Sequence, residues 1–150
     1  MTTDTSWVGP AMHQSVPWVM TAGVEFGETT PQRVVAHLPE AAELHNHLAA
    51  PHAAMIFGLG ETASGAVSLA AFGAAMERAT PLVVRSEVRY LKLARGRLTA
   101  EAVLDRDPAD VLAELDAGER PEFTVEVTIT DESGRETTRM TVVWTLRPNR

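Results

Sequence analysis

The chain has 150 residues and a mass of 16.2 kDa, the size of one domain, and its 45% of apolar residues suffices to build one core. We therefore expect a single domain over residues 1–150. The net charge of -7 argues against nucleic acid or an anionic membrane surface as the main partner, because both attract basic proteins. The absence of cysteine excludes disulfides, thiolate metal ligands and a cysteine nucleophile. The first residues lack the basic-then-apolar order of a signal peptide, so we expect a cytoplasmic protein.

The first part of the chain predicts a short packed segment followed by a hairpin. Prolines and scattered apolar residues over 9–20 are typical of a short helix or turn that packs on the main body. Residues 21–26 and 33–38 alternate between apolar and polar well enough to be strands. The segment 27–31 between them contains the glycine and proline of a turn.

Residues 53–76 carry one charge only, that of Glu61, and favour a helix that is buried on all sides. Ala, Gly and Ser make up most of this stretch, so we expect its hydrophobicity to be too weak for a membrane span. Four glycines in the stretch are expected where other backbone approaches closely. Burial would cost the Glu61 carboxylate its hydration, so this group should be paired, protonated or kept for chemistry.

Four more strands are predicted after this helix by runs of alternating apolar residues, at 83–92, 98–104, 123–130 and 140–146. Residues 94–96 and 131–134 provide turns within this region. Asp107 and Pro108 begin a predicted connecting helix that ends at Gly118.

The predicted element order is two strands, one long helix and four strands, and tight turns favour a largely antiparallel sheet wrapped around the helix. A single sheet would leave one face of an all-apolar helix exposed. We therefore expect a second copy of the chain to complete its burial, which predicts at least a homodimer. The sequence leaves open whether two dimers pair into a tetramer.

The segment from Asn46 to Glu61 resembles the entrance motif of hotdog-fold acyl-CoA thioesterases of the phenylacetyl-CoA thioesterase type. Those enzymes carry an Asn or Gln, a His-Gly-Gly sequence that begins six residues later, and an Asp or Glu nine residues after the His. The corresponding residues here are Asn46, His52-Ala53-Ala54 and Glu61. Residues 17–19 and 89–96 also resemble a family of thioesterases known mainly as an uncharacterised domain, and this likeness covers roughly residues 15–147.

The resemblance implies an α+β hotdog fold, in which a curved antiparallel sheet wraps a long central helix and dimers share their active sites. It also implies hydrolysis of an acyl thioester, carried by coenzyme A or by a carrier protein, without a cofactor. Glu61 would act from the partner subunit as base or nucleophile, and the backbone N–H of Ala53 would stabilise the oxyanion with the helix dipole behind it. Asn46 would orient water or the carbonyl, and His52 would hold the entry loop or contact Asn46. Substrate contacts are expected from Ala54, Thr62 and Gly65.

Three alanines depart from the family pattern. Ala53 and Ala54 replace the motif glycines, and Ala49 replaces a glycine often found between the Asn and the His. A backbone N–H survives this change, but the added methyl groups would narrow the acyl pocket or exclude a conformation with positive φ. Glu61 in place of Asp permits covalent catalysis through an anhydride as well as activation of water.

Other interpretations of the same residues stay open at this point. Glu61 could be a structural carboxylate held by a backbone N–H or by Arg89. The three histidines at 45, 47 and 52 could suggest a metal site, although no nearby acid completes an obvious ligand set. His47 and Glu61 are fourteen residues apart, the separation found in hotdog dehydratases and hydratases of acyl carriers. A non-catalytic acyl-CoA-binding protein could use the same groove.

A local excess of positive charge suits the phosphates of coenzyme A. It comprises Arg85, Arg89, Lys92, Arg95 and Arg97, against the single acid Glu87. Alternate residues of a strand face opposite ways, so all five cannot serve one site and some belong to a solvated face. Arg95 and Arg97, near the turn, are the expected phosphate contacts.

Overall fold

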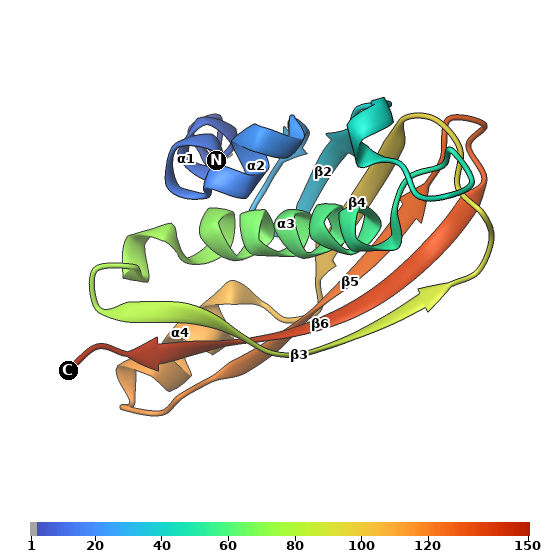
Figure 1. Ribbon diagram of the computed structural model, residues 1–150. Coiled ribbons are helices and arrows are strands. Elements are labelled where there is room, and N and C mark those ends of the chain that lie inside the picture. The colour runs from blue at the N-terminus through green and yellow to red at the C-terminus, as the bar shows by residue number, and fades with distance from the viewer. Residues whose placement is uncertain (1–2) are drawn as a thin grey trace.

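One curved, antiparallel sheet of six strands wraps around a long helix in the computed structural model, which describes residues 3–150 (Figure 1). The strand order is β1-β2-β4-β5-β6-β3. The strands are β1 (Glu25–Thr29), β2 (Arg33–Leu38), β3 (Ala79–Tyr90), β4 (Leu98–Leu104), β5 (Glu122–Thr130) and β6 (Glu136–Pro148). The element order and the antiparallel sheet confirm the sequence-based prediction.

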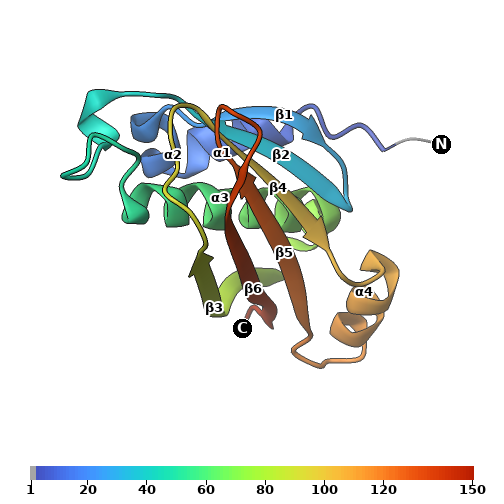
Figure 2. The same cartoon turned by 90° about the vertical axis from the view of Figure 1, so that its right-hand side faces the viewer.

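Four helices and two short 3₁₀ turns complete the fold. They are α1 (Val8–Ser15), α2 (Pro17–Ala22), η1 (Ala42–Leu44), α3 (Ala53–Phe72), η2 (Gly73–Ala75) and α4 (Pro108–Asp116). The side chain of Asp107 caps α4 by accepting the backbone N–H of Ala109, and Pro108 occupies the first turn, as its sequence predicted. Figure 2 shows the sheet curving around α3, with β1 and β2 on one side and β3 on the other.

The N-terminal segment forms two helices, α1 and α2, and this displaces the first predicted strand. Residues 21 and 22 end α2 instead of starting a strand, and Gly23 stops the helix with a φ of 76°. The strand β1 therefore begins at Glu25 and extends to Thr29. Both helices lie against the side of α3 opposite β3, β5 and β6, so they cover part of the helix face that we expected a second copy to bury (Figure 1).

The strand β3 lies at the edge of the sheet and pairs with β6, not with β4, which follows it in the chain. It begins four residues before the predicted start, because Ala79 to Leu82 already pair with the end of β6. Its second edge has no neighbour within residues 3–150. A long edge strand with unpaired backbone groups is a surface on which another strand can pair.

The four glycines of the central helix and of η2 face large side chains. The expectation that other backbone would approach them closely was therefore wrong. Each of the three tryptophans of the chain packs against one of them. The pairs are Gly58 with Trp18, Gly65 with Trp144 and Gly73 with Trp7, while Gly60 faces Met140.

The stretch Ala53–Ala75 is long and apolar enough to cross a membrane by length and composition alone, so the expectation that it would be too weakly apolar was wrong. Within the fold, 61% of its most apolar window is buried. The sheet and the N-terminal helices supply this cover, and α3 is the core helix that the absence of charge predicted.

Candidate functional site

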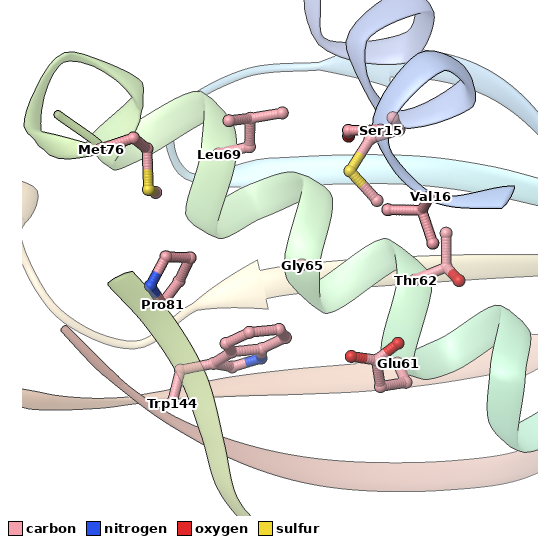
Figure 3. Close-up of a pocket in the computed structure, with 10 residues that line it drawn as sticks. Ser15, Val16, Glu61, Thr62, Gly65, Leu69, Met76, Pro81 and Trp144 are labelled. Carbon is pink, nitrogen blue, oxygen red and sulfur yellow. The ribbon is translucent and has the colours of Figure 1, made fainter. Parts of the chain in front are cut away.

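Glu61 lies on α3 at one end of a cavity of about 280 Å³ (Figure 3). The residues that line the cavity come from α1 and the position after it, from α3 and the turn that follows it, and from the strands β3 and β6. Its lining residues are Met12, Ser15, Val16, Glu61, Thr62, Gly65, Leu69, Met76, Pro81 and Trp144. The structure thus brings two of the predicted substrate contacts, Thr62 and Gly65, beside Glu61.

The Glu61 carboxylate has no hydrogen bond and no ion pair with any residue from 3 to 150. Burial raises its pKa above the ordinary value for a glutamate, because the apolar surroundings disfavour the charged form. Arg89 lies on β3 opposite Arg139 and does not pair with Glu61. Neither a backbone N–H nor Arg89 therefore binds the Glu61 carboxylate within residues 3–150, as a purely structural role for this group would require.

A hydrogen-bonded chain fixes the helix turn that carries Glu61. The indole N–H of Trp144 donates to the Ser64 hydroxyl over 3.0 Å, and that hydroxyl donates to the backbone carbonyl of Glu61 over 2.7 Å. Both Trp144 and Ser64 are buried. Trp144 was not predicted as a site residue, because the alternation of its strand predicts that the side chain faces inward but not which helix residue it contacts.

The loop before α3 is organised by Asn46. Its side-chain oxygen accepts the backbone N–H of Leu48 over 2.8 Å and that of Ala50 over 3.3 Å. Ala49, within this turn, has a φ of 53°, a left-handed conformation that an L side chain adopts at some cost. The conformational cost of replacing the family glycines thus falls on Ala49, because Ala53 and Ala54 are helical.

His52 is the N-cap of α3. Its Nδ1 accepts the backbone N–H of Ala54 over 2.9 Å, and its own backbone N–H donates to Leu44 over 2.9 Å. The imidazole thus holds the entry loop against the helix start. The Ala54 N–H is consumed by this cap, whereas the N–H of Ala53 has no acceptor among residues 3–150.

A second cavity, of about 350 Å³, lies at this helix start between α3 and the end of β3. Its lining residues are Asn46, Pro51, Ala53, Ile56, Tyr90, Leu91, Lys92, Leu93 and Ala94. The Tyr90 hydroxyl donates to the backbone carbonyl of Ala53 over 3.2 Å. Lys92 is the one basic residue among the described residues that line this cavity, and it was not among the expected phosphate contacts.

Within one chain the predicted catalytic residues lie in two different places. Asn46 and Ala53 line the second cavity, and Glu61 lines the first. Eight residues separate Ala53 from Glu61 along α3, which corresponds to a rise of about 12 Å. Within one chain these three residues therefore do not line a common cavity.

The remaining candidates are dispersed. Arg97 pairs with Glu25 over 3.0 Å, so its charge is already engaged, while Arg95 is exposed next to the second cavity. His47 is exposed and lines neither cavity, so it does not meet Glu61 within one chain. His45 pairs with Glu40. No group of three or more His, Cys, Asp or Glu side chains suited to a metal occurs in residues 3–150.

Comparison with known proteins gives one family and many similar folds. Residues 5–146 match the family described as domain of unknown function DUF4442. No protein with a curated description matches the chain. Several of the similar solved structures carry thioesterase descriptions, and three of them show the range of similarity.

A Pseudomonas aeruginosa protein of unknown function, described as a probable thioesterase, is 25% identical, with a TM-score of 0.84 and 99% of each chain covered. A thioesterase family protein from Silicibacter pomeroyi is 19% identical, with a TM-score of 0.76 and 97% and 100% coverage of this chain and that one. A hypothetical thioesterase from Streptococcus pneumoniae, solved with coenzyme A, is 18% identical, with a TM-score of 0.71 and coverage of 94% and 98%. The fold is the hotdog fold of thioesterase-like proteins, as the resemblance implied.

Proposed function

The chain belongs to the DUF4442 family, and on that premise we propose that it hydrolyses an acyl thioester of coenzyme A, with Glu61 as the catalytic carboxylate. The observation that carries this proposal is the Glu61 carboxylate in an apolar cavity, without a partner in residues 3–150. A perturbed carboxylate without a structural partner is typical of a catalytic group. The Streptococcus pneumoniae thioesterase solved with coenzyme A supports coenzyme A as the carrier.

Glu61 would serve as a general base. Its carboxylate takes a proton from water as the water oxygen attacks the thioester carbonyl carbon, and the carbonyl oxygen becomes negative. Collapse of this intermediate breaks the carbon–sulfur bond, and Glu61 returns the proton to the leaving thiolate. In the covalent variant a Glu61 oxygen attacks the carbon itself, the thiolate leaves, and water then hydrolyses the anhydride.

The oxyanion would be stabilised at the helix start of a second copy. The N–H of Ala53 has no acceptor within the described part of its own chain, and the positive end of the α3 dipole lies behind it. The Asn46 side-chain oxygen is used within its loop, so its amide N–H₂ is the group left to orient the substrate. These donors and Glu61 would form one site across the interface of a homodimer.

The edge strand β3 is the surface that we propose for this dimer. Its outer edge is unpaired within the described residues, and large apolar side chains are exposed on it and directly after it. These residues are Val83, Val84, Tyr90, Leu91 and Leu93. Pairing two copies of β3 would satisfy the free backbone groups and cover this apolar surface.

Thiol release from acyl-CoA substrates tests the proposal, with wild-type protein beside Glu61→Gln. The amide is nearly isosteric but can act neither as a base nor as an anionic nucleophile, so we expect kcat to fall by about 10²–10⁴-fold. Glu77→Gln, at an exposed position beyond the end of the same helix, is the matched control and should keep full activity. Undiminished turnover in folded Glu61→Gln would exclude the mechanism.

A further inference from the structure

Resting on the function proposed above, we infer that the cavity beside Glu61 selects a compact, uncharged acyl group, with Gly65 and Trp144 setting its width and Leu69 and Met76 its length. The reacting carbonyl would lie at the Glu61 end. The acyl group would extend along α3 away from it.

The cavity follows one face of α3. Glu61, Gly65 and Leu69 succeed one another at four-residue steps, a spacing that aligns side chains along a helix. In Figure 3 the side chains of Leu69, Met76 and Pro81 gather at the end of the cavity away from Glu61. The cavity is therefore a groove with the proposed catalytic group at one end.

The width of the groove is set at its middle by Gly65 and Trp144. A Cβ atom placed on Gly65 would lie 3.5 Å from the six-membered ring of Trp144, an ordinary contact distance. The hydrogen bond to Ser64 fixes the orientation of that ring. The gap between Gly65 and this ring therefore holds about one methyl group, and a side chain larger than alanine at this position would project into the groove or displace the ring.

The length of the groove is limited by Leu69 and Met76. Leu69 is eight residues beyond Glu61, which corresponds to about 12 Å along the helix. The volume of about 280 Å³ is just below the range of roughly 300–1,000 Å³ found for pockets that hold drug-sized ligands. We therefore expect the groove to hold short and medium acyl groups in preference to a long fatty acyl chain.

The charge of the groove excludes acidic acyl groups. Among residues 3–150, Glu61 is the one charged residue that lines it, and Ser15 and Thr62 add hydroxyl groups. An acyl group with a carboxylate would place a second negative charge near the Glu61 carboxylate. That charge would lose its hydration in the groove without a cation to balance it.

The test is a profile of kcat/KM over straight-chain acyl-CoA substrates from acetyl to palmitoyl, with phenylacetyl-CoA and succinyl-CoA added. We expect wild-type protein to prefer short and medium neutral acyl groups. Leu69→Ala should shift the ratio of long-chain to medium-chain kcat/KM upward by about tenfold or more. Gly65→Leu should lower activity on medium-chain and phenylacetyl substrates while sparing acetyl-CoA.

The matched control for truncation is Val103→Ala, at an exposed position of β4 that lines neither cavity, and its profile should equal that of the wild type. A profile that does not respond to either groove variant, in folded protein, overturns the inference. So does a wild-type preference for palmitoyl-CoA or succinyl-CoA.

Calorimetric binding of non-hydrolysable acyl-CoA thioethers of the same series separates this inference from the proposed function. Affinities that follow the predicted profile without any thiol release would support the groove and overturn hydrolysis. Hydrolysis that depends on Glu61, with a substrate profile that neither groove variant changes, would support hydrolysis and overturn the groove. Absence of both binding and turnover would overturn both.

Discussion

Trp144 and Ser64 are joined by a buried hydrogen bond in which the indole N–H donates to the hydroxyl oxygen. The same hydroxyl donates to the backbone carbonyl of Glu61. This link connects the sheet to the helix turn that carries the proposed catalytic group, across eighty residues of sequence.

We expect Ser64→Ala to lower the free energy of unfolding by about 1–3 kcal/mol, because it leaves the buried indole N–H without an acceptor. Ser68→Ala is the matched control, since the Ser68 hydroxyl donates to the Ser64 backbone carbonyl and its removal strands no donor. That variant should lose less than about 1 kcal/mol. Chemical denaturation of both variants measures the difference, and equal losses would contradict the assigned role of the bond.

The raised pKa of Glu61 predicts a defined pH dependence of stability. Folding favours the protonated acid, so proton binding to Glu61 contributes to the free energy of unfolding. This contribution is fully present below the pKa of an unfolded glutamate, and it is lost as pH rises through the higher pKa of Glu61 in the folded protein. Glutamine stays uncharged at every pH, so Glu61→Gln does not suffer the loss of stability that ionisation of the buried carboxyl causes. The variant should therefore be more stable than wild-type protein at neutral pH, and the difference should shrink in acid.

Activity should depend on pH in the opposite direction to stability and rise with pH, because only the ionised Glu61 carboxylate can act as a base. The acid limb of kcat/KM should reflect a pKa above the ordinary range of glutamate. Urea denaturation and thiol release over the same pH series measure the two effects. An acid limb at the ordinary value, or a Glu61→Gln variant that is less stable at neutral pH, would contradict this assignment.

Ala49 offers a test of backbone strain in the entry loop. Its φ of 53° is a conformation that glycine adopts without a steric cost, so Ala49→Gly should raise the free energy of unfolding by about 1 kcal/mol. Ala113→Gly, at an exposed position inside α4, should instead lower it by about 0.5–1 kcal/mol. Thermal and urea unfolding of the pair distinguish relief of strain from a general effect of glycine.

Gly58 and Gly65 should respond differently to a methyl group. A Cβ on Gly58 would lie 2.4 Å from the ring of Trp18, so Gly58→Ala should destabilise the fold by about 1–3 kcal/mol through overpacking. A Cβ on Gly65 meets Trp144 at 3.5 Å, and Gly65→Ala should leave stability unchanged or higher. Melting temperatures of the two variants check this, and a tolerated Gly58→Ala would show that Trp18 can move aside.

Local patterns predicted much of this fold. The alternation of residues 98–104 defined β4 without error, and the cap and proline at Asp107 and Pro108 defined α4. The absence of charge predicted the buried α3. Boundaries were wrong where local and tertiary signals compete: Thr21 belongs to α2, which Gly23 ends, although its neighbourhood alternates like a strand.

Among the residues that line the cavity beside Glu61, only residues on α3 were named as site residues from the sequence. The four-residue spacing of Glu61, Gly65 and Leu69 is visible in the sequence, and it could have added Leu69 to the predicted contacts. Trp144 and Met12 meet that face through the sheet register and the docking of α1, which no local pattern encodes. No local pattern encodes the pairing of β3 with β6 in place of β4 either.

The central claim is that Glu61 acts on a thioester held by Asn46 and Ala53 of a second copy, and subunit complementation tests it most directly. Asn46→Asp keeps the oxygen that organises the loop but removes the amide donor, and Glu61→Gln removes the base. Each variant alone should be nearly inactive. When the two are unfolded together and refolded at equal amounts, mixed dimers should each regain one intact site, which restores roughly a quarter of wild-type thiol release. Activity in the mixture no higher than the mean of the two variants would contradict a site shared between subunits.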